Sequence, residues 1–119
     1  MSTLFRNSLK QKMDQYIHFA YGISKQFPRD ELYGVTSQFR RSSLSVILNY
    51  IEGYARRTLG SQLNFFRISY GSLKESEYLF DFCYKENYLS QDEFKEGSLL
   101  ADEIGAMLWS EINALEAKQ

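Results

Sequence analysis

Apolar residues recur along most of the chain at steps of three and four, the spacing that gathers them on one face of a helix. The first such segment ends at Phe27 and Pro28, because a residue that precedes proline is pushed away from helical geometry. Helical spacing resumes after a break at Gly34 and continues to about Gly53 or Arg56. The first half of the chain therefore predicts two helices.

The second half predicts two further helices. The third segment follows Gly60 and ends at a turn near Asn87. The fourth begins with Ser-Gln-Asp-Glu at residues 90–93, which fits a capping box. In that motif the Ser90 hydroxyl accepts a hydrogen bond from the Glu93 amide, and the Glu93 side chain reaches back to the Ser90 amide. These four residues thus mark the start of the fourth helix.

The fourth segment also carries a seven-residue apolar repeat. Its members are Phe94, Ala101, Leu108 and Leu115, and Gly97 and Ile104 fill the alternate positions. Only Glu111 interrupts the pattern. Seven-residue spacing is typical of the seam between helices in a bundle or a coiled coil.

The predicted helices are joined by short connections, so consecutive helices should run antiparallel. Residues 61–86 and 91–117 would each form a rod of roughly 40 Å, and the first two helices rods of about 30 Å. A single proline and few turn clusters argue against a many-stranded sandwich or barrel. We expect an all-α protein, one domain over residues 1–119, folded as an up-down-up-down antiparallel four-helix bundle.

The overall charge is close to zero, with 14 basic and 15 acidic residues among 119, but the charge is unevenly distributed. Residues 1–60 hold nine basic and four acidic residues, a balance of +5. Residues 61–119 hold five basic and eleven acidic residues, a balance of −6. The two halves can neutralise each other within one bundle, or pair between the subunits of a ring.

The composition, 44% hydrophobic and 24% charged, is typical of a globular protein and excludes several classes of function. One cysteine cannot form an internal disulfide, and no apolar run approaches the roughly 18 residues of a membrane span. The first residues lack the apolar stretch of a secretion signal. We therefore expect a cytoplasmic protein without a membrane partner.

Catalytic, cofactor and metal sites are not predicted. His18 is the only histidine and Cys83 the only cysteine, so one chain cannot assemble a zinc site from these residue types. The glycine-rich loops that bind nucleotides are absent from the sequence. An enzyme with a site shared between subunits around Arg41, Glu52 and Glu75 is the least favoured hypothesis, because these carboxylates lack a tuned partner.

Nine Phe, nine Tyr and one Trp make up 16% of the chain. A bundle of this size has one narrow core and cannot hide all nineteen rings. These rings could simply extend the edges of the core, since single exposed apolar residues are normal. Contiguous exposed patches usually mark an interface, so we favour self-association.

A polar stripe interrupts the otherwise apolar second helix. Its members, at steps of three and four, are Arg41, Ser45, Asn49, Glu52 and Arg56. The arginines could reach Glu75 or Glu77 of the third helix or a neighbouring subunit. A guanidinium binds carboxylate and phosphate equally well, so residue type alone leaves both partners open.

Two basic pairs, Arg40-Arg41 and Arg56-Arg57, invite an RNA-binding interpretation. RNA binding would weaken steeply with salt, because phosphate contacts release counterions. The alternative is that these arginines form ion pairs with acidic residues of the second half of the chain. With a pI near 5.8, the protein lacks the excess of basic residues that most nucleic-acid-binding proteins have.

Four segments of the chain form a recognisable pattern. They are Phe27-Pro28-x-x-Glu31-x-x-Gly34-Val35-Thr36-Ser37-Gln38-Phe39-Arg40-Arg41, then Ser45 to Gly53, Gly71-Ser72-Leu73-x-Glu75-x-Glu77 and Tyr88-Leu89-Ser90-x-x-Glu93-Phe94. The first of them resembles the central motif of a bacterial four-helix-bundle family, often encoded in intervening sequences of large-subunit ribosomal RNA genes. Ile47 replaces the family's helix proline, and Leu48 and Ile51 replace alanines, which adds bulk to that surface.

This resemblance implies a homopentamer of four-helix bundles around a central channel, with no known catalysis. A related branch, the accessory proteins of diversity-generating retroelements, works with a reverse transcriptase and nucleic acid. Our leading hypothesis is a non-enzymatic, homo-oligomeric scaffold or adaptor. The alternative is an RNA- or retroelement-associated accessory protein that binds nucleic acid or a reverse transcriptase through Arg40, Arg41, Arg56 and Arg57.

Overall fold

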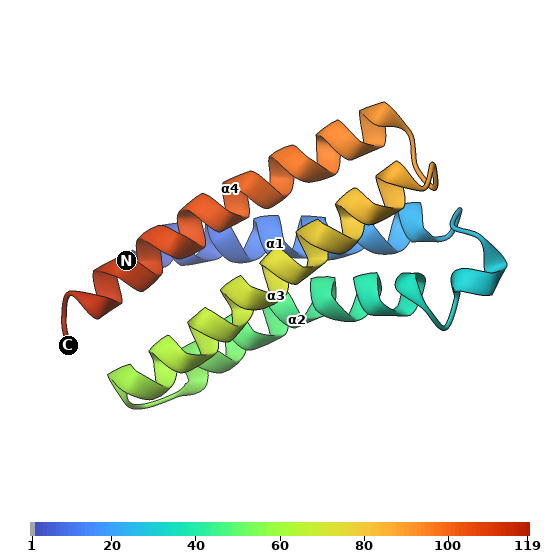
Figure 1. The fold of residues 1–119 in the computed structure, drawn as a ribbon. Coiled ribbons are helices and arrows are strands. Elements are labelled where there is room, and N and C mark those ends of the chain that lie inside the picture. Colours follow the sequence, from blue (N-terminus) through green and yellow to red (C-terminus); the bar gives the residue numbers. More distant parts are fainter. Residues whose placement is uncertain (1) are drawn as a thin grey trace.

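Four long helices make up most of the computed structural model, which describes residues 2–119 (Figure 1). They are α1 (Thr3–Ser24), α2 (Val35–Ala55), α3 (Leu59–Lys85) and α4 (Gln91–Glu116), and a short 3₁₀ helix, η1 (Arg29–Glu31), lies between α1 and α2. The described part of the chain contains no strand. The prediction of an all-α protein with four helices is confirmed.

Local chemistry fixes the helix ends close to where the sequence predicts them. Helix α4 starts with the predicted capping box: the Glu93 amide donates to the Ser90 hydroxyl at 3.1 Å, and the Ser90 amide donates to the Glu93 carboxylate at 2.8 Å. The hydrogen bonds that the Glu93 carboxylate accepts from the Ser90 backbone amide and from the Gln26 side chain hold the pKa of Glu93 below its usual value. Helix α3 is capped by Thr58, whose hydroxyl accepts from the Ser61 amide.

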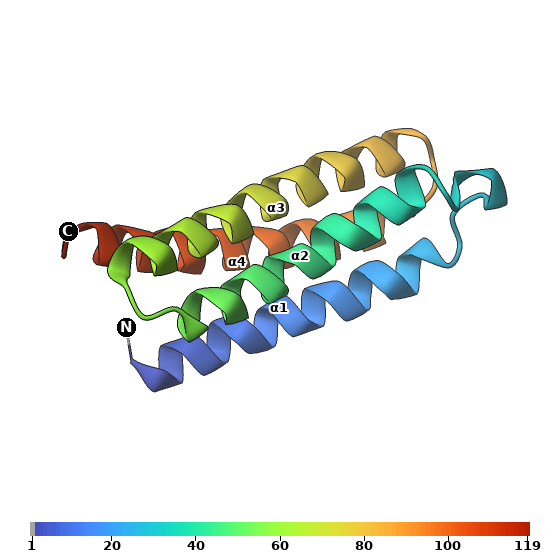
Figure 2. The ribbon, with the colours of Figure 1, turned by 90° about the horizontal axis from the view of Figure 1, so that it is seen from below.

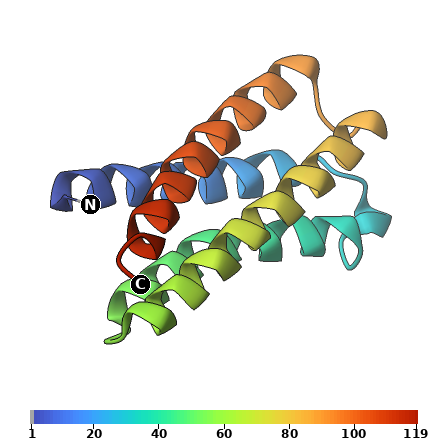
Figure 3. The same cartoon turned by 60° about the vertical axis from the view of Figure 1, so that its left-hand side comes forward.

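Each helix packs along two neighbours, so that α1 contacts α2 and α4, and α3 contacts the same two helices. Helices α2 and α4 therefore occupy opposite corners of the bundle (Figure 2). Both termini and the α2–α3 turn lie at one end of the molecule, whereas the α1–α2 and α3–α4 turns lie at the other (Figures 1 and 3).

The core consists of two clusters along the bundle axis. The cluster toward the termini contains Leu9, Met13, Tyr16, Val46, Tyr50, Leu63, Phe66, Leu73, Ile104 and Leu108 among others. The other cluster is built around stacked rings, with Phe80 5.6 Å from Phe39 and 5.4 Å from Phe94 between ring centres. Each cluster buries three aromatic residues: Tyr16, Tyr50 and Phe66 lie in the cluster toward the termini, and Phe27, Phe39 and Phe80 lie in the other.

Buried serines bring α3 close to its neighbours. The Ser69 hydroxyl donates to the Val46 carbonyl of α2 at 2.6 Å, and the Ser76 and Tyr16 hydroxyls share a hydrogen bond of 2.7 Å. Ser69 and Ser76 are fully buried, and both hydroxyls have partners. Ser69 thus holds α3 against α2, whereas Ser76 joins α3 to α1 across the core, and the α2–α3 contact positions the polar stripe of α2.

Candidate functional site

The predicted polar stripe lies along the edge of α2 that faces α3. Ser45 shares a hydrogen bond of 2.8 Å with the Ser72 hydroxyl of α3. The side-chain amide nitrogen of Asn49 donates to both the backbone carbonyl and the hydroxyl of Ser45, at 2.9 and 2.8 Å. The middle of the stripe therefore contributes to the α2–α3 contact.

A shallow groove of about 380 Å³ continues the stripe toward the start of α2. Its lining residues are Gln38, Arg41, Ser42, Ser45, Ser72 and Glu75. Arg41 and Glu75 thus share one surface, as the sequence suggested, although no ion pair joins them. Glu52 lies outside this groove and pairs with Arg56 of its own helix at 2.6 Å, so the three residues of the shared-enzyme hypothesis do not converge within one chain. An exposed ion pair between residues one turn apart in a helix contributes only about 0.3–0.5 kcal/mol to the stability of the fold.

The two basic pairs lie far apart. Fifteen residues separate Arg41 from Arg56, which corresponds to about 22 Å along a helix. Arg40 is half-buried: its Nε donates to the Ser24 hydroxyl at 2.7 Å, and its guanidinium lies 5.0 Å from the centre of the Tyr21 ring. The exposed members are Arg41, Arg56 and Arg57, so the structure divides the predicted basic surface into two ends.

An exposed apolar stripe runs beside the polar one. Leu44, Leu48 and Ile51 of α2 are 36%, 53% and 44% exposed. They follow Arg40 at steps of four, four and three, so they share the side of α2 that faces α1. Leu48 and Ile51 are the two positions at which bulk was expected on this surface.

A polar cluster that the sequence did not assign surrounds Glu111, the residue that interrupts the seam of α4. Glu111 is only 3% exposed, and the Tyr50 hydroxyl of α2 donates to its carboxylate at 2.5 Å. Tyr50 is itself 1% exposed, and its hydroxyl lies 3.3 Å from that of Tyr54. The interruption of the seam was visible in the sequence, but its partner, 61 residues away, was not.

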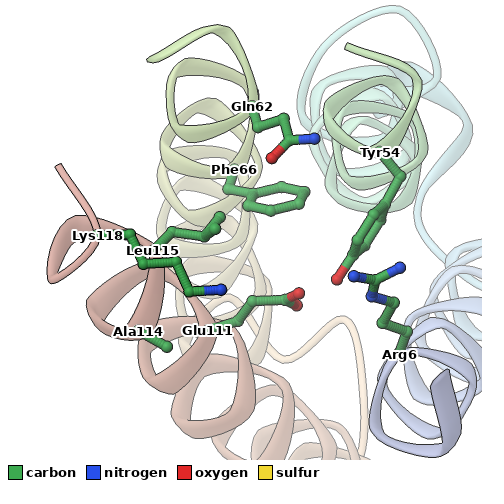
Figure 4. Close-up of a pocket in the computed structure, with 8 residues that line it drawn as sticks. All are labelled: Arg6, Tyr54, Gln62, Phe66, Glu111, Ala114, Leu115 and Lys118. Carbon is green, nitrogen blue, oxygen red and sulfur yellow. The ribbon is translucent and has the colours of Figure 1, made fainter. Parts of the chain in front are cut away.

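The carboxylate of Glu111 faces a small pocket at the end of the bundle near the termini (Figure 4). All four helices and the segment after α4 contribute to its lining: Arg6, Tyr54, Gln62, Phe66, Glu111, Ala114, Leu115 and Lys118. The Arg6 guanidinium lies 4.3 Å from the centre of the Tyr54 ring. A volume of about 60 Å³ accommodates a few water molecules.

Burial raises the pKa of Glu111 above its ordinary value, and the hydrogen bond from Tyr50 and the charge of Arg6 oppose this rise. Burial also raises the pKa of Tyr50, as does the neighbouring carboxylate. Tyr50 is therefore a hydrogen-bond donor and not a base. The cluster can hold a proton on Glu111 and join α2 to α4 through a polar contact.

We expect Glu111→Gln to stabilise the protein at neutral pH, because glutamine keeps an oxygen for the Tyr50 hydroxyl and carries no charge. A raised folded-state pKa means that the stabilisation from the protonated carboxyl is complete below about 4.5, its ordinary value, and is lost as the pH rises through the folded pKa. The advantage of glutamine should thus grow from pH 4 to pH 7. Urea denaturation of both proteins across this range measures it, and a pH-independent difference would contradict the assignment.

The remaining residues with distinctive chemistry are placed as follows. Cys83 is fully buried, and burial raises the pKa of its thiol to about 12, so the thiol stays protonated and unreactive. His18 is exposed, and its Nε2 lies 3.5 Å from Oδ1 of Asp14, one turn earlier in α1. Within residues 2–119, no three His, Cys, Asp or Glu side chains gather as a metal site would require.

A membrane-spanning segment is likewise not found among the described helices, none of which combines the necessary length with sufficient apolar character.

A solved structure shares this fold. It is the crystal structure of a Bacteroides thetaiotaomicron protein of unknown function from the S23 ribosomal protein family. The two chains superpose with a TM-score of 0.85 at 19% sequence identity, over 92% of this chain and 98% of that one. No curated protein matches the sequence.

The sequence also matches a family model, described as 23S rRNA-intervening sequence protein, over residues 6–110. This span begins in α1 and ends in α4, so it includes the polar stripe, the apolar stripe and Tyr50. The chain belongs to the family of 23S rRNA-intervening sequence proteins.

Proposed function

We propose that this protein is a non-enzymatic, homo-oligomeric scaffold or adaptor. Its up-down-up-down antiparallel bundles assemble into a ring, with five copies as the number that the family resemblance implies. The observation that carries the proposal is the exposed apolar stripe of Leu44, Leu48 and Ile51 on α2.

Several further large apolar side chains are exposed outside this stripe. They include Tyr21, Leu32, Tyr33, Ile68, Tyr78, Phe82, Leu99 and Trp109. Scattered single residues need no partner, but Leu44, Leu48 and Ile51 form a continuous row over two helical turns. Covering such a row with a second copy removes apolar surface from water at about 25 cal/mol per Å².

The buried polar cluster supports stability in this proposal and not a reaction. Glu111 and Tyr50 satisfy each other, and the pocket beside them has room for solvent only. The polar stripe likewise supports the α2–α3 contact through Ser45 and Asn49. Assembly then becomes the property through which the protein acts, by presenting several identical surfaces at once.

Size-exclusion chromatography with multi-angle light scattering at low micromolar concentration tests the proposal. We expect one species with a mass several-fold above the 14.0 kDa of a single chain. Because apolar burial drives the assembly, the species should persist at about 0.5 M salt, where the Debye length falls below 5 Å. A homogeneous monomer across the concentration range would contradict the proposal.

A further inference from the structure

The unequal charge of the two chain halves becomes a spatial asymmetry in the bundle. Helix α4 carries seven acidic residues and one basic residue. Helix α2, with the two arginines that follow it, carries four basic residues and one acidic residue. These two helices occupy opposite corners of the bundle, because each packs along α1 and α3, and only the Tyr50–Glu111 hydrogen bond across the core joins them to each other. One side of the molecule is therefore basic and another acidic.

The basic side carries an apolar ridge. We define the α2 ridge as Arg41, Leu44, Leu48 and Ile51. Its three apolar side chains are exposed and lie on the side of α2 that faces α1. Arg41 is exposed and forms no ion pair within the described chain.

The acidic side carries a groove of about 410 Å³ between α1 and α4. This α1/α4 groove is lined by Gln15, Phe19, Glu96, Leu99, Leu100 and Glu103. Leu99 is 63% exposed at its edge. Glu103 pairs with Lys12 at 2.8 Å, whereas Glu96 has no ion-pair partner among residues 2–119. The groove thus combines an apolar surface with one free carboxylate.

We infer that the α2 ridge of one copy docks into the α1/α4 groove of a second copy. This inference rests on the proposed self-assembly and identifies the two surfaces that meet. Leucine and isoleucine side chains of the ridge cover Phe19, Leu99 and Leu100, and the guanidinium of Arg41 approaches the carboxylate of Glu96. The interface is head-to-tail, because each copy contributes a different surface to its two neighbours.

The heights of these residues along the bundle agree with such a contact. Helices α2 and α4 begin at the same end of the molecule (Figure 1). Arg41 is six residues into α2 and Glu96 is five residues into α4, or about 9 and 7.5 Å along the axes. Leu44 and Leu99 lie about 13.5 and 12 Å along the same axes. Copies rotated about an axis parallel to the helices would therefore align acid with base and leucine with leucine.

The positions of the two surfaces also favour closure. Both flank α1, since the leucine and isoleucine side chains of the ridge lie toward α1, with Arg41 at the edge of the ridge toward α3, and the groove lies between α1 and α4. The two surfaces therefore do not face in opposite directions. Each added copy is rotated relative to the one before it, always in the same sense. A head-to-tail contact with a constant turn closes into a ring when the rotation divides a full circle.

Two single substitutions test the inference: Leu48→Glu in the ridge and Leu99→Glu in the groove. Both side chains are more than half exposed, so we expect each variant to fold, as circular dichroism will show. Each should raise the dissociation constant of the assembly on the order of 30-fold, the factor that corresponds to about 2 kcal/mol at an interface hot spot. Tyr78→Glu on α3, at a position 68% exposed and outside both surfaces, is the matched control and should assemble normally.

Mixing the two variants provides the sharper measurement. A Leu99→Glu chain keeps an intact ridge, and a Leu48→Glu chain keeps an intact groove, so the mixture should form a one-to-one heterodimer and no larger species. If the interface instead joined the same surface of both copies, mixing the two variants would not restore association.

Light scattering distinguishes the outcomes. If the wild-type chain is a monomer, the proposed self-assembly itself is wrong. If the wild type assembles but Leu48→Glu or Leu99→Glu leaves its mass unchanged, or if Tyr78→Glu dissociates it equally, these two surfaces are not the interface. Failure of the mixed variants to associate would also overturn the head-to-tail pairing.

Discussion

Replacing Tyr50 with alanine should lower the free energy of unfolding by about 3–5 kcal/mol, the range for removal of a large buried side chain. Tyr50 is 1% exposed, and its ring lies 5.2 Å from that of Phe66 and 5.1 Å from that of Tyr54. The substitution leaves a cavity in the cluster of core residues nearer the termini. It also removes the hydrogen-bond donor of the buried Glu111, so two costs add.

Tyr50→Phe separates these two costs. The ring remains, and the loss should shrink to about 1–3 kcal/mol, the cost of leaving a buried polar group without its partner. Because the lost hydrogen bond holds the pKa of Glu111 down, this pKa should rise further in the variant. The penalty should therefore be larger at pH 7 than at pH 4, where the carboxyl can be protonated.

Urea denaturation at a fixed protein concentration measures both variants, because assembly makes apparent stability depend on concentration. Tyr54→Phe is the matched control, since Tyr54 is a half-buried residue whose hydroxyl lies 3.3 Å from that of Tyr50 at the edge of the cluster. We expect a change of only a few tenths of a kcal/mol there, about 0.5 at most. Equal losses in Tyr50→Phe and Tyr54→Phe would refute the role given to the Tyr50–Glu111 contact.

The second large effect is expected at Gly97 of α4. A Cβ atom at this position would lie 2.5 Å from Cζ of Phe80 and 2.6 Å from Cε1 of Phe19. Phe80 is stacked between Phe39 and Phe94 and cannot move aside without disturbing both. We therefore expect Gly97→Ala to destabilise the fold by about 1–3 kcal/mol, as overpacking does, despite the higher helix propensity of alanine.

Gly71→Ala is the control for the helix-propensity effect. Gly71 lies in the interior of α3, and no atom outside its own helix lies within 4 Å of the added Cβ. The substitution should stabilise the protein by about 0.5–1 kcal/mol. Thermal unfolding of the two variants should thus shift in opposite directions, and a stabilised Gly97→Ala would show that the aromatic stack yields easily.

The arrangement of neighbouring residues shows where sequence patterns stop being informative. Arg40 and Arg41 form one basic pair in the sequence, yet Arg40 binds Ser24 and Tyr21 of α1, whereas Arg41 lines the groove beside α3. Successive residues of a helix point about 100° apart, so adjacent arginines face different neighbours. The spacing predicted a stripe, but only the packed helices determine what each member faces.

Features that depend on local chemistry could be predicted from the amino-acid sequence alone. Helical periodicity, the break before Pro28 and the capping box at Ser90 each involve residues within a few positions of one another, so the interactions they predict form wherever the chain folds. The number of helices and most of their boundaries followed from these signals. The seven-residue seam of α4 likewise predicted which of its faces is buried, because a continuous apolar stripe is covered in any bundle.

Contacts between groups far apart in the chain could not be predicted from the sequence and follow from the packing of the helices. The sequence marked Glu111 as an interruption of the seam, but its burial is tolerated because Tyr50, from the helix at the opposite corner, reaches across the core to it. Likewise, the two oppositely charged chain halves became two surfaces on either side of α1 only when the order of the four helices around the bundle was fixed. Contacts between residues far apart in the chain depend on the register and rotation of whole helices, and local periodicity determines neither.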